Sequence, residues 1–381
     1  MRITIVGAGP AGLYFGLLMK KLDPSHEVTI LERDGPDDTY GWGIVFSDQT
    51  LSYLEDHDRA SHDAITSAFE TWDNVDVVHR DAKISVRGNR FSGIARVAML
   101  NILQARCLEL GVEIRFKTNV SRVQDLPAHD LLVGADGANS LVRRTFAERF
   151  EPSLDVRRNK YIWLGTRRPF DGLTLTFRPD EAGLFVAHSY RFNRSTSTFI
   201  VECVGDTWER SGLAEMSEEQ AVAYLERVFA PDLDGERLLT NDFVRWLSFI
   251  IVKNHRWHHR NVVLLGDALH TAHFSIGSGT KLALEDAITL SGCFDGRREV
   301  AEALAEFERV RKPVVDDLQR AAEASLEWFE HADARMHLEP IPLAYELMTR
   351  SAKIDYDRLQ RRDPEFVRRY EEWRAGAAGE K

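Results

Sequence analysis

Three glycines and one carboxylate near the start of the chain have a spacing that is typical of dinucleotide-binding sites. Gly7, Gly9 and Gly12 form a G-x-G-x-x-G turn, and Glu32 follows 20 residues after the last glycine. Gly7 makes the tight turn, Gly9 lets the backbone approach a pyrophosphate, and Gly12 lets a helix pack closely on a strand. Free N–H groups at a helix N-terminus near Ala11 would face the phosphates, and Glu32 could accept hydrogen bonds from both ribose hydroxyls.

A strand, a turn, a helix and a second strand are needed to position these residues. Residues 3–6 are a short apolar run, residues 11–21 have helical spacing, and residues 27–31 form another apolar run that ends directly before Glu32. All parts occur in register, which favours a nucleotide site over a plain glycine loop. The acid at position 32 disfavours a 2′-phosphate on the ribose.

Two later segments repeat the pattern of an apolar strand that runs into a loop. Residues 130–143 contain Asp136-Gly137, and residues 261–270 contain Gly266-Asp267. Together with the first turn, these motifs resemble, in order and separation, those of the single-component (class A) flavoprotein aromatic hydroxylases. The resemblance spans about residues 1–290.

That resemblance implies FAD as the cofactor. Asp267 would hold the ribityl hydroxyls of the flavin, and Asp136 would contact the cofactor from the central motif. The turn at Gly277, Gly279 and Thr280 would lay backbone N–H groups against the pyrimidine edge.

The same resemblance assigns two further parts of the chain. Gly43, in the loop Gly41–Ser47, would let the backbone run beside the isoalloxazine ring, with Ile44 next to the substrate. Trp42 is either part of this contact or core packing. Arg96 would reach the FAD phosphates or the flavin edge, and a solvated arginine is the alternative.

A closer likeness lies within that family. Residues 158–163, 197–203 and 273–280 look like those of the anthraniloyl-CoA and salicylyl-CoA hydroxylases and of the tryptophan hydroxylase of violacein biosynthesis. Residues 347–351 and 361–364 resemble the acyl-CoA branch more than the tryptophan branch. The anthraniloyl-CoA enzymes carry a second flavin reductase domain after this point. The sequence here ends at Lys381, so we expect no ring reduction to follow hydroxylation.

In this family, reduced FAD captures oxygen as a C4a-hydroperoxide, and an electron-rich aromatic ring attacks the distal oxygen. The protein binds and orients the ring and excludes water. We therefore expect O2 and an aromatic small molecule as substrates. No second nucleotide fingerprint follows the first, so NADH or NADPH would approach the same flavin transiently as the reductant.

A hydroxyl or amine on the ring needs a proton acceptor as charge develops, and imidazole is suited to this near neutral pH. The candidate catalytic residues are His273, beside the flavin-edge turn, and His188, on a substrate-domain strand. A packed structural histidine is the alternative for each, and for His188 it is the favoured one. Phe274 is a candidate substrate contact, whereas His270 is expected to be a structural part of its turn.

A CoA tail would need phosphate-binding cations in the substrate domain. Lys160 and Arg191 are the candidate substrate contacts, accompanied by Arg157, Arg158 and Arg194. A solvated basic face is an equally good interpretation of these five residues.

Composition excludes several classes of protein. The 49 basic and 60 acidic residues give a net charge of −11 without a long Lys/Arg block, which argues against nucleic-acid binding. Cys107, Cys203 and Cys293 lie far apart, so neither a metal site nor a disulfide framework is indicated. The chain opens directly into a strand without a signal-peptide pattern, and no apolar run approaches about 20 residues, so we expect a cytoplasmic protein without a membrane span.

The expected fold class is α/β and similar to that of p-hydroxybenzoate hydroxylase. Apolar strands alternate with helical patterns in residues 1–156 and 257–300, which would form a discontinuous Rossmann-like FAD-binding domain. Residues 157–256 contain alternating stretches that predict an inserted antiparallel substrate-binding sheet. Residues 301–381 would form a C-terminal helical region.

These features predict an FAD-dependent aromatic monooxygenase that hydroxylates an aryl-CoA thioester, above all salicylyl-CoA, para to its donor group. A tryptophan or indolic hydroxylase and an anthraniloyl-CoA hydroxylase are the alternatives within the class, and a non-catalytic flavin-binding sensor is the alternative outside it. A flavin halogenase would need a Trp-x-Trp-x-Ile-Pro segment, which the sequence lacks. The sequence is compatible with an amine or a hydroxyl as the donor group on the ring, and with NADH or NADPH as the reductant. It is also compatible with a monomer or a dimer.

Overall fold

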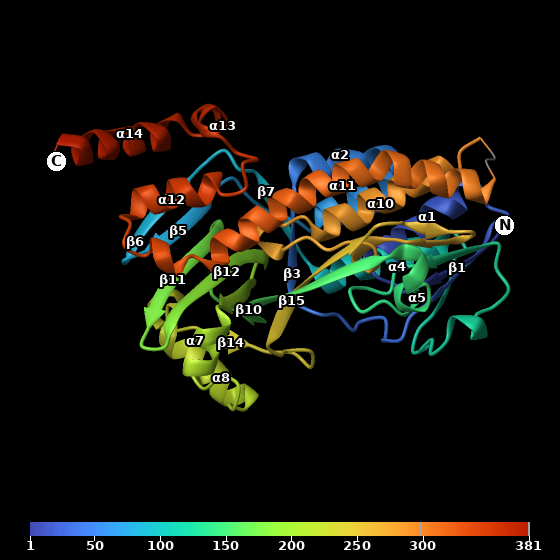
Figure 1. Cartoon of the computed structure of the whole chain (residues 1–381), viewed down its shortest axis with the longest axis horizontal. Coiled ribbons are helices and arrows are strands. Elements are labelled where there is room, and N and C mark those ends of the chain that lie inside the picture. The colour runs from blue at the N-terminus through green and yellow to red at the C-terminus, as the bar shows by residue number, and fades with distance from the viewer. Residues whose placement is uncertain (297–298, 380–381) are drawn as a thin grey trace.

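The computed structural model describes residues 1–296 and 299–379, without the side chains of residues 47–51, 378 and 379. Two large sheets lie towards opposite ends of the molecule, and a long helix, α11 (Val300–Glu330), runs from one to the other (Figure 1). The N-terminus belongs to the first sheet, and the C-terminal helices lie beside the second (Figure 1).

The first sheet is six-stranded, with the order β16-β17-β9-β1-β2-β8. Its strands are β1 (Arg2–Val6), β2 (Glu27–Leu31), β8 (Glu113–Arg115), β9 (Leu131–Gly134), β16 (His258–His259) and β17 (Val262–Leu264). All neighbours pair in parallel except β16 and β17. Strands β1 and β9 are almost wholly apolar because helices cover both faces of a parallel sheet. Residues 2–31 contain the expected succession of strand, glycine turn, helix and strand, and after residue 261 strand β17 pairs with β9 in this sheet.

Helix α1 (Pro10–Leu22) leaves the glycine turn and packs against α4 (Arg96–Glu109) and α10 (Gly279–Cys293). Ten of its 13 residues are buried, so it is a core helix and not a half-exposed one. Four shorter helices also precede strand β10 of the second sheet: α2 (Asp48–His57), α3 (Arg59–Ser67), α5 (Leu141–Thr145) and α6 (Ala147–Phe150).

The second sheet is eight-stranded, with the order β14-β10-β13-β12-β11-β5-β6, and β15 pairs with β10. Its strands are β5 (Val75–His79), β6 (Ala82–Val86), β10 (Pro152–Thr166), β11 (Leu173–Asp180), β12 (Gly183–Asn193), β13 (Thr196–Cys203), β14 (Leu238–Leu239) and β15 (Leu247–Asn254). Strands β10 to β13 pair antiparallel, as the alternating pattern predicts. Helices α7 (Gly205–Arg210), α8 (Glu218–Val228) and α9 (Ala230–Leu233) follow β13.

The structure differs from the expected domain boundaries in two ways. Strands β5 and β6 belong to the second sheet, where β5 pairs in parallel with β11, although they lie within residues 1–156. Strand β10 begins at Pro152 and pairs with β15 from there, so residue 156 lies inside a strand. A small third sheet of β3 (Gly43–Ser47), β7 (Phe91–Ala95) and β4 (Glu70–Trp72) connects the two regions.

The described residues from 300 to 379 are mainly helical. After α11 come α12 (Pro340–Thr349), α13 (Tyr356–Arg362) and α14 (Pro364–Gly379). Helix α12 packs on β5 and β6, where Leu343, Leu347 and Phe366 join Val77 and Phe177 in one apolar cluster. The C-terminal helices therefore close one side of the second sheet.

Three observations concern the described ranges 1–296 and 299–379. No helix there is long and apolar enough to cross a membrane. No group of three or more His, Cys, Asp or Glu side chains there could hold a metal ion. Cys107, Cys203 and Cys293 are buried and form no disulfide bond within these ranges.

Candidate active site

A cavity of about 700 Å³ lies between the two large sheets. Its wall comes from the start of α1, strand β3, the strands β10 to β13, the loop of residues 266–281, and the C-terminal helices. This volume lies within the range of roughly 300–1,000 Å³ that is usual for small-molecule sites.

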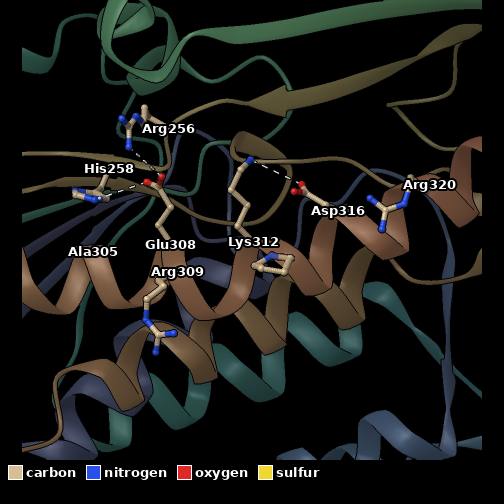
Figure 2. Close-up of a pocket in the computed structure, with 9 residues that line it drawn as sticks. Arg256, His258, Ala305, Glu308, Arg309, Lys312, Asp316 and Arg320 are labelled. Carbon is tan, nitrogen blue, oxygen red and sulfur yellow. Dashed lines mark ion pairs between the residues drawn. The ribbon is translucent and has the colours of Figure 1, made fainter.

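A second pocket, of about 550 Å³, lies beside α11 (Figure 2). Its charged side chains pair with one another: Lys312 with Asp316, and both Arg256 and His258 with Glu308. Because these charges are compensated and none of the predicted site residues line this pocket, the first cavity is the candidate active site.

The glycine turn forms one end of the cavity. Gly7 has φ +105°, and a Cβ there would lie 2.3 Å from the carbonyl oxygen of Ala135; a Cβ on Gly12 would lie 2.1 Å from the Gly7 oxygen. Gly9 lines the cavity, and a Cβ on it would meet nothing within 4 Å. Ala11 lines the cavity too, and α1 has no side-chain cap. Free helix N–H groups therefore face an open space, as a pyrophosphate requires.

Glu32 lies beside this turn. Its Oε2 accepts a hydrogen bond of 2.7 Å from the Ala8 N–H, and its Oε1 accepts one of 3.0 Å from the Asp34 N–H. These bonds fix the carboxylate at the edge of the turn, and each oxygen keeps a lone pair for a ribose hydroxyl.

Asp136 has a different role from the one expected. Its Oδ1 accepts a hydrogen bond from the Ser140 hydroxyl, and its Oδ2 accepts one of 2.6 Å from the Leu141 N–H at the start of α5. In this central motif Ala135 and Gly137 line the cavity, and Asp136 does not. The aspartate thus shapes the loop that brings its neighbours to the cofactor.

Asp267 and Arg96 form the middle of the cavity wall. The Asp267 side chain is exposed to the cavity. Desolvation by the surrounding protein raises its pKa, and the positive charge of Arg96 opposes that shift. Burial lowers the pKa of Arg96, with Asp267 opposing, and the Arg96 Nε atom is buried without a partner in the described part of the chain. Both groups have unused hydrogen-bonding capacity towards the cavity.

The Asp267 loop is held from behind by a buried cluster. The Gly266 N–H donates a hydrogen bond of 3.2 Å to Oδ2 of Asp286, which also lies 2.8 Å from His270 Nε2 and, through Oδ1, 2.9 Å from Arg311. His270 is therefore a structural residue of this turn, as expected.

The start of α10 supplies the last part of the cradle. Gly277 has φ +62°, a Cβ on Gly279 would meet nothing within 4 Å, and α10 begins there without a side-chain cap. Gly277, Gly279 and Thr280 all line the cavity. With uncapped N–H groups at both ends and Asp267 between them, the residues fit FAD: phosphates at α1, ribityl hydroxyls at Asp267 and the flavin edge at α10.

Strand β3 contributes Ile44 to the cavity but not Gly43. The Gly43 N–H donates to Thr198 Oγ1 at 2.9 Å, and a Cβ on Gly43 would lie 2.6 Å from Phe192. Trp42 packs its ring on Gly165. Gly43 and Trp42 therefore serve close packing against the second sheet, which is the alternative stated above for Trp42.

His188 lies on the cavity wall and is 4% exposed. Its Nε2 lies 2.6 Å from Oε1 of Glu202, which is 1% exposed. In the β12–β13 register His188 is opposite Ile200, so Glu202, two residues farther along, points to the same face. Burial alone would raise the pKa of Glu202, but the hydrogen bond from His188 helps to hold it below its usual value.

Because an ionised carboxylate only accepts, His188 donates its Nε2–H to Glu202. The described residues form no hydrogen bond to Nδ1, so that nitrogen keeps its lone pair for a proton from a substrate. His188 is thus hydrogen-bonded to a buried carboxylate, as a structural histidine would be, and it also faces the cavity.

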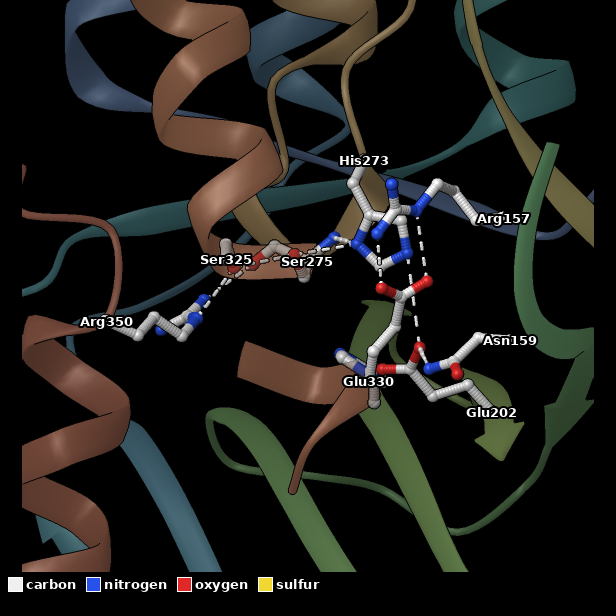
Figure 3. Close-up of polar contacts among 9 residues, drawn as sticks. Arg157, Asn159, Glu202, His273, Ser275, Ser325, Glu330 and Arg350 are labelled. Carbon is white, nitrogen blue, oxygen red and sulfur yellow. Dashed lines mark hydrogen bonds and ion pairs between the residues drawn. The ribbon is translucent and has the colours of Figure 1, made fainter. Parts of the chain in front are cut away.

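His273 lies behind the cavity wall rather than on it. It is 2% exposed; its Nδ1 lies 2.8 Å from Ser275 Oγ, and its Nε2 lies 4.0 Å from Glu202 (Figure 3). Burial lowers the pKa of His273 to about 4, so it is neutral near pH 7. Phe274 lines the cavity, whereas the neighbouring ring of His273, 4.0 Å away between centroids, does not. This geometry therefore does not provide the direct contact that was expected between His273 and the substrate.

One buried polar network joins two residues of the cavity wall (Figure 3). From Ser275, a contact of 2.8 Å leads to Ser325, which accepts a hydrogen bond of 2.8 Å from Arg350 Nε. Arg350 lines the cavity and also donates to the Ser275 carbonyl at 2.7 Å. Burial lowers its pKa to about 10, with Glu202 opposing that shift.

The basic residues expected to bind a CoA tail are engaged elsewhere. Lys160 donates to Ser248 Oγ at 2.9 Å, Arg191 lies 3.4 Å from Glu70, and Arg157 pairs with both Asp155 and Glu330. Lys160, Arg191, Arg157, Arg158 and Arg194 do not line the cavity. Arg157, Arg158 and Lys160 lie on β10, Arg191 lies on β12, and Arg194 follows β12, so their likeness to a phosphate site came from sequence proximity.

Sequence reasoning missed three side chains of this site. Glu202 stands out as an acid in the apolar run of residues 198–203, which is a signal of a buried partner. Arg350 lies in residues 347–351, which the sequence marked only by their resemblance to the acyl-CoA branch of the family. Tyr161 lines the cavity 5.0 Å, between ring centroids, from Phe274.

A model of the FAD binding domain family matches residues 1–322. The chain is 40% identical over 98% of its length to salicyloyl-CoA 5-hydroxylase of a Streptomyces species, of which it covers 74%. It is 35% identical to protodeoxyviolaceinate monooxygenase of Chromobacterium violaceum, covering 89% of this chain and 91% of that one.

A third relative is 34% identical: 3-hydroxy-4-methyl-anthranilyl-(aryl-carrier protein) 5-monooxygenase of Streptosporangium sibiricum, with 93% of this chain and 96% of that one covered. Among solved structures, 2-methyl-3-hydroxypyridine-5-carboxylic acid oxygenase has the same fold, with a TM-score of 0.73, 19% identity, and 95% and 97% of the two chains covered. The chain therefore belongs to the FAD binding domain family and is a flavin-dependent aromatic monooxygenase.

Proposed function

We propose that this enzyme uses NADH or NADPH and O2 to hydroxylate an aryl-CoA thioester, with salicyloyl-CoA as the first substrate to test. The observation that carries the proposal is His188, which lines the cavity that also contains the flavin cradle and is hydrogen-bonded to the buried Glu202 behind it. The 40% identity to a salicyloyl-CoA 5-hydroxylase supports the thioester class.

FAD, once reduced, activates O2 to an electrophilic oxygen donor, and the chain's own residues prepare the aromatic ring. As the ring attacks, its hydroxyl becomes more acidic, and Nδ1 of His188 takes the proton. Glu202 then faces an imidazolium, which its negative charge stabilises in a site of low dielectric constant. Hydroxylation follows at the carbon para to that hydroxyl, where the released electron density is available.

The walls around His188 exclude water. The rings of Phe274 and Phe329 lie 5.3 and 4.8 Å from the imidazole, measured between centroids. Leu175, Tyr161 and Ile200 also line this part of the cavity. Apolar walls protect the activated oxygen from solvent, which would otherwise release hydrogen peroxide.

An anthraniloyl thioester is the second candidate, because Nδ1 of His188 can accept a proton from an aromatic amine as well as from a hydroxyl. The aryl-carrier-protein relative, whose name describes an anthranilyl group, favours this candidate. An indolic substrate is the third, and the protodeoxyviolaceinate monooxygenase relative favours it.

A substrate panel distinguishes these candidates. The FAD-loaded enzyme is mixed with salicyloyl-CoA, anthraniloyl-CoA, the free acids and tryptophan, while NADH oxidation, peroxide and hydroxylated product are measured together. We expect coupled turnover with the thioesters alone. Coupled turnover with a free acid or with tryptophan, and none with either thioester, would contradict the proposal.

A further inference from the structure

We propose that two arginines of α13, Arg358 and Arg362, bind the phosphate of a pantetheine arm that carries the aryl thioester into the cavity. This inference rests on the proposed thioester substrate and names the part of the site that recognises its tail. Both arginines line the cavity, and both are exposed at its rim.

Cations follow the cavity from its interior to this rim. Arg350 is half-buried and belongs to the network behind His273, whereas Lys353, Arg358 and Arg362 are exposed. The whole chain has a net charge of −11, so three exposed cations that line one cavity depart from the average charge of its surface. Such a row attracts a polyanionic tail.

The two arginines have charge to spare, in contrast to the cations on the second sheet. Arg362 donates to the side-chain oxygen of Asn89 at 2.8 Å, and Arg358 donates to the carbonyl of Lys353. Both acceptors are neutral, and no carboxylate within the described ranges lies within ion-pair distance of either guanidinium. Lys353 differs, because it pairs with Asp317. A guanidinium held by neutral oxygens keeps its affinity for phosphate, which it can bind through two N–H groups.

Between the rim and His188 the cavity wall is mostly apolar. Its lining there is contributed by Val75, Phe91, Leu173, Leu175, Met348 and Ile354. A pantetheine arm is uncharged and flexible, with a phosphate at its far end, so it matches an apolar passage that ends in arginines. The free aryl acids have nothing that would reach the rim.

The test compares thioesters that differ only in their tails. Steady-state KM and kcat are measured for the aryl-CoA, the aryl-4′-phosphopantetheine and the aryl-pantetheine thioesters, the last of which has no phosphate. The variants are Arg358→Gln/Arg362→Gln and, as a matched control, Arg361→Gln, an exposed α13 arginine that does not line the cavity.

We expect the double variant to raise KM at least about tenfold for both phosphorylated thioesters, with kcat nearly unchanged and with no effect on aryl-pantetheine. The control should match the wild type. Equal effects on phosphorylated and unphosphorylated thioesters, or no effect on any, would overturn the proposal.

Two sources can supply this chemistry, coenzyme A or a carrier protein with a phosphopantetheine arm, and a carrier-loaded substrate forms the third arm of the test. A lower KM for the carrier-loaded thioester than for aryl-CoA assigns the rim to a carrier protein, and the reverse assigns it to CoA. Direct binding of CoA to the FAD-loaded protein separates the two proposals. If CoA binding depends on the two arginines but no thioester is hydroxylated, the phosphate-binding role of the arginines is supported and the proposed function is contradicted.

Discussion

Nε2 of His188 lies 2.6 Å from Oε1 of Glu202, both side chains are almost fully buried, and His188 lines the cavity that contains the flavin cradle. A carboxylate in this position orients the imidazole and fixes its tautomer. In the proposed mechanism, the pair is therefore the part of the site on which hydroxylation depends most.

Replacing His188 by Ala should uncouple the enzyme. FAD stays bound because His188 is outside the cradle, but the ring loses its proton acceptor, and hydroxylation should slow by about 10²–10⁴-fold. NADH is still consumed, hydrogen peroxide accumulates, and the ratio of product to NADH falls. His255→Ala, at an exposed histidine, is the control. An unchanged product ratio in His188→Ala would remove this residue from the chemistry.

Glu202→Gln tests whether the carboxylate acts through His188. The variant keeps the shape of the side chain but cannot stabilise an imidazolium, so hydroxylation should slow at neutral pH while the KM for substrate changes little. Raising the pH until the phenolic substrate enters deprotonated should restore much of the rate, because no proton then needs an acceptor. A merely structural role predicts a loss that high pH does not relieve.

The contiguous parts of this site were predictable from the sequence, and the reason is local. Gly7, Gly9 and Gly12 meet steric demands set within one turn, and Glu32 follows at a distance fixed by one helix and one strand. The fold class and the antiparallel second sheet also followed from patterns that are read within a single element.

The rest depended on contacts between distant segments. Glu202 reaches His188 only through the register of β12 with β13, and a shift of one residue would turn it to the other face. Arg358 and Arg362 reach the cavity because α12 packs on β5 and β6 and brings α13 to the rim. For His273, position between two cofactor motifs suggested the cavity, but the backbone turn presents Phe274 there instead.

Asp267→Ala should weaken FAD binding without changing the choice of aromatic substrate. The carboxylate is open to the cavity, and each hydrogen bond to a ribityl hydroxyl that is left unpaired costs about 1–3 kcal/mol. This corresponds to a rise in the FAD Kd of roughly 5- to 150-fold per bond. Flavin fluorescence titration of the apoprotein measures it. Asp267→Asn, which retains an acceptor, should lose less; an unchanged Kd in Asp267→Ala would refute the ribityl assignment.

His273 should make the folded protein sensitive to mild acid. Burial lowers its pKa in the folded state from the usual 6.5 to about 4, and Arg350, Arg157 and His188 disfavour its charged form further, against Glu202. Between these two pH values the unfolded chain binds a proton that the folded chain does not. The free energy of unfolding should therefore fall as the pH falls through this window, by up to about 1.4 kcal/mol per pH unit.

His273→Asn cannot take up this proton, so its free energy of unfolding should fall less than that of the wild type between about pH 7 and about pH 5. Urea unfolding of both proteins with saturating FAD, followed by tryptophan fluorescence, gives the difference between the two slopes. Glu202, whose pKa is lowered, also loses stabilisation as the pH falls through its folded-state pKa, and it does so in both proteins. Parallel pH dependences would show that His273 already takes up its proton in the folded state, and would return it to the list of possible proton acceptors in the hydroxylation step.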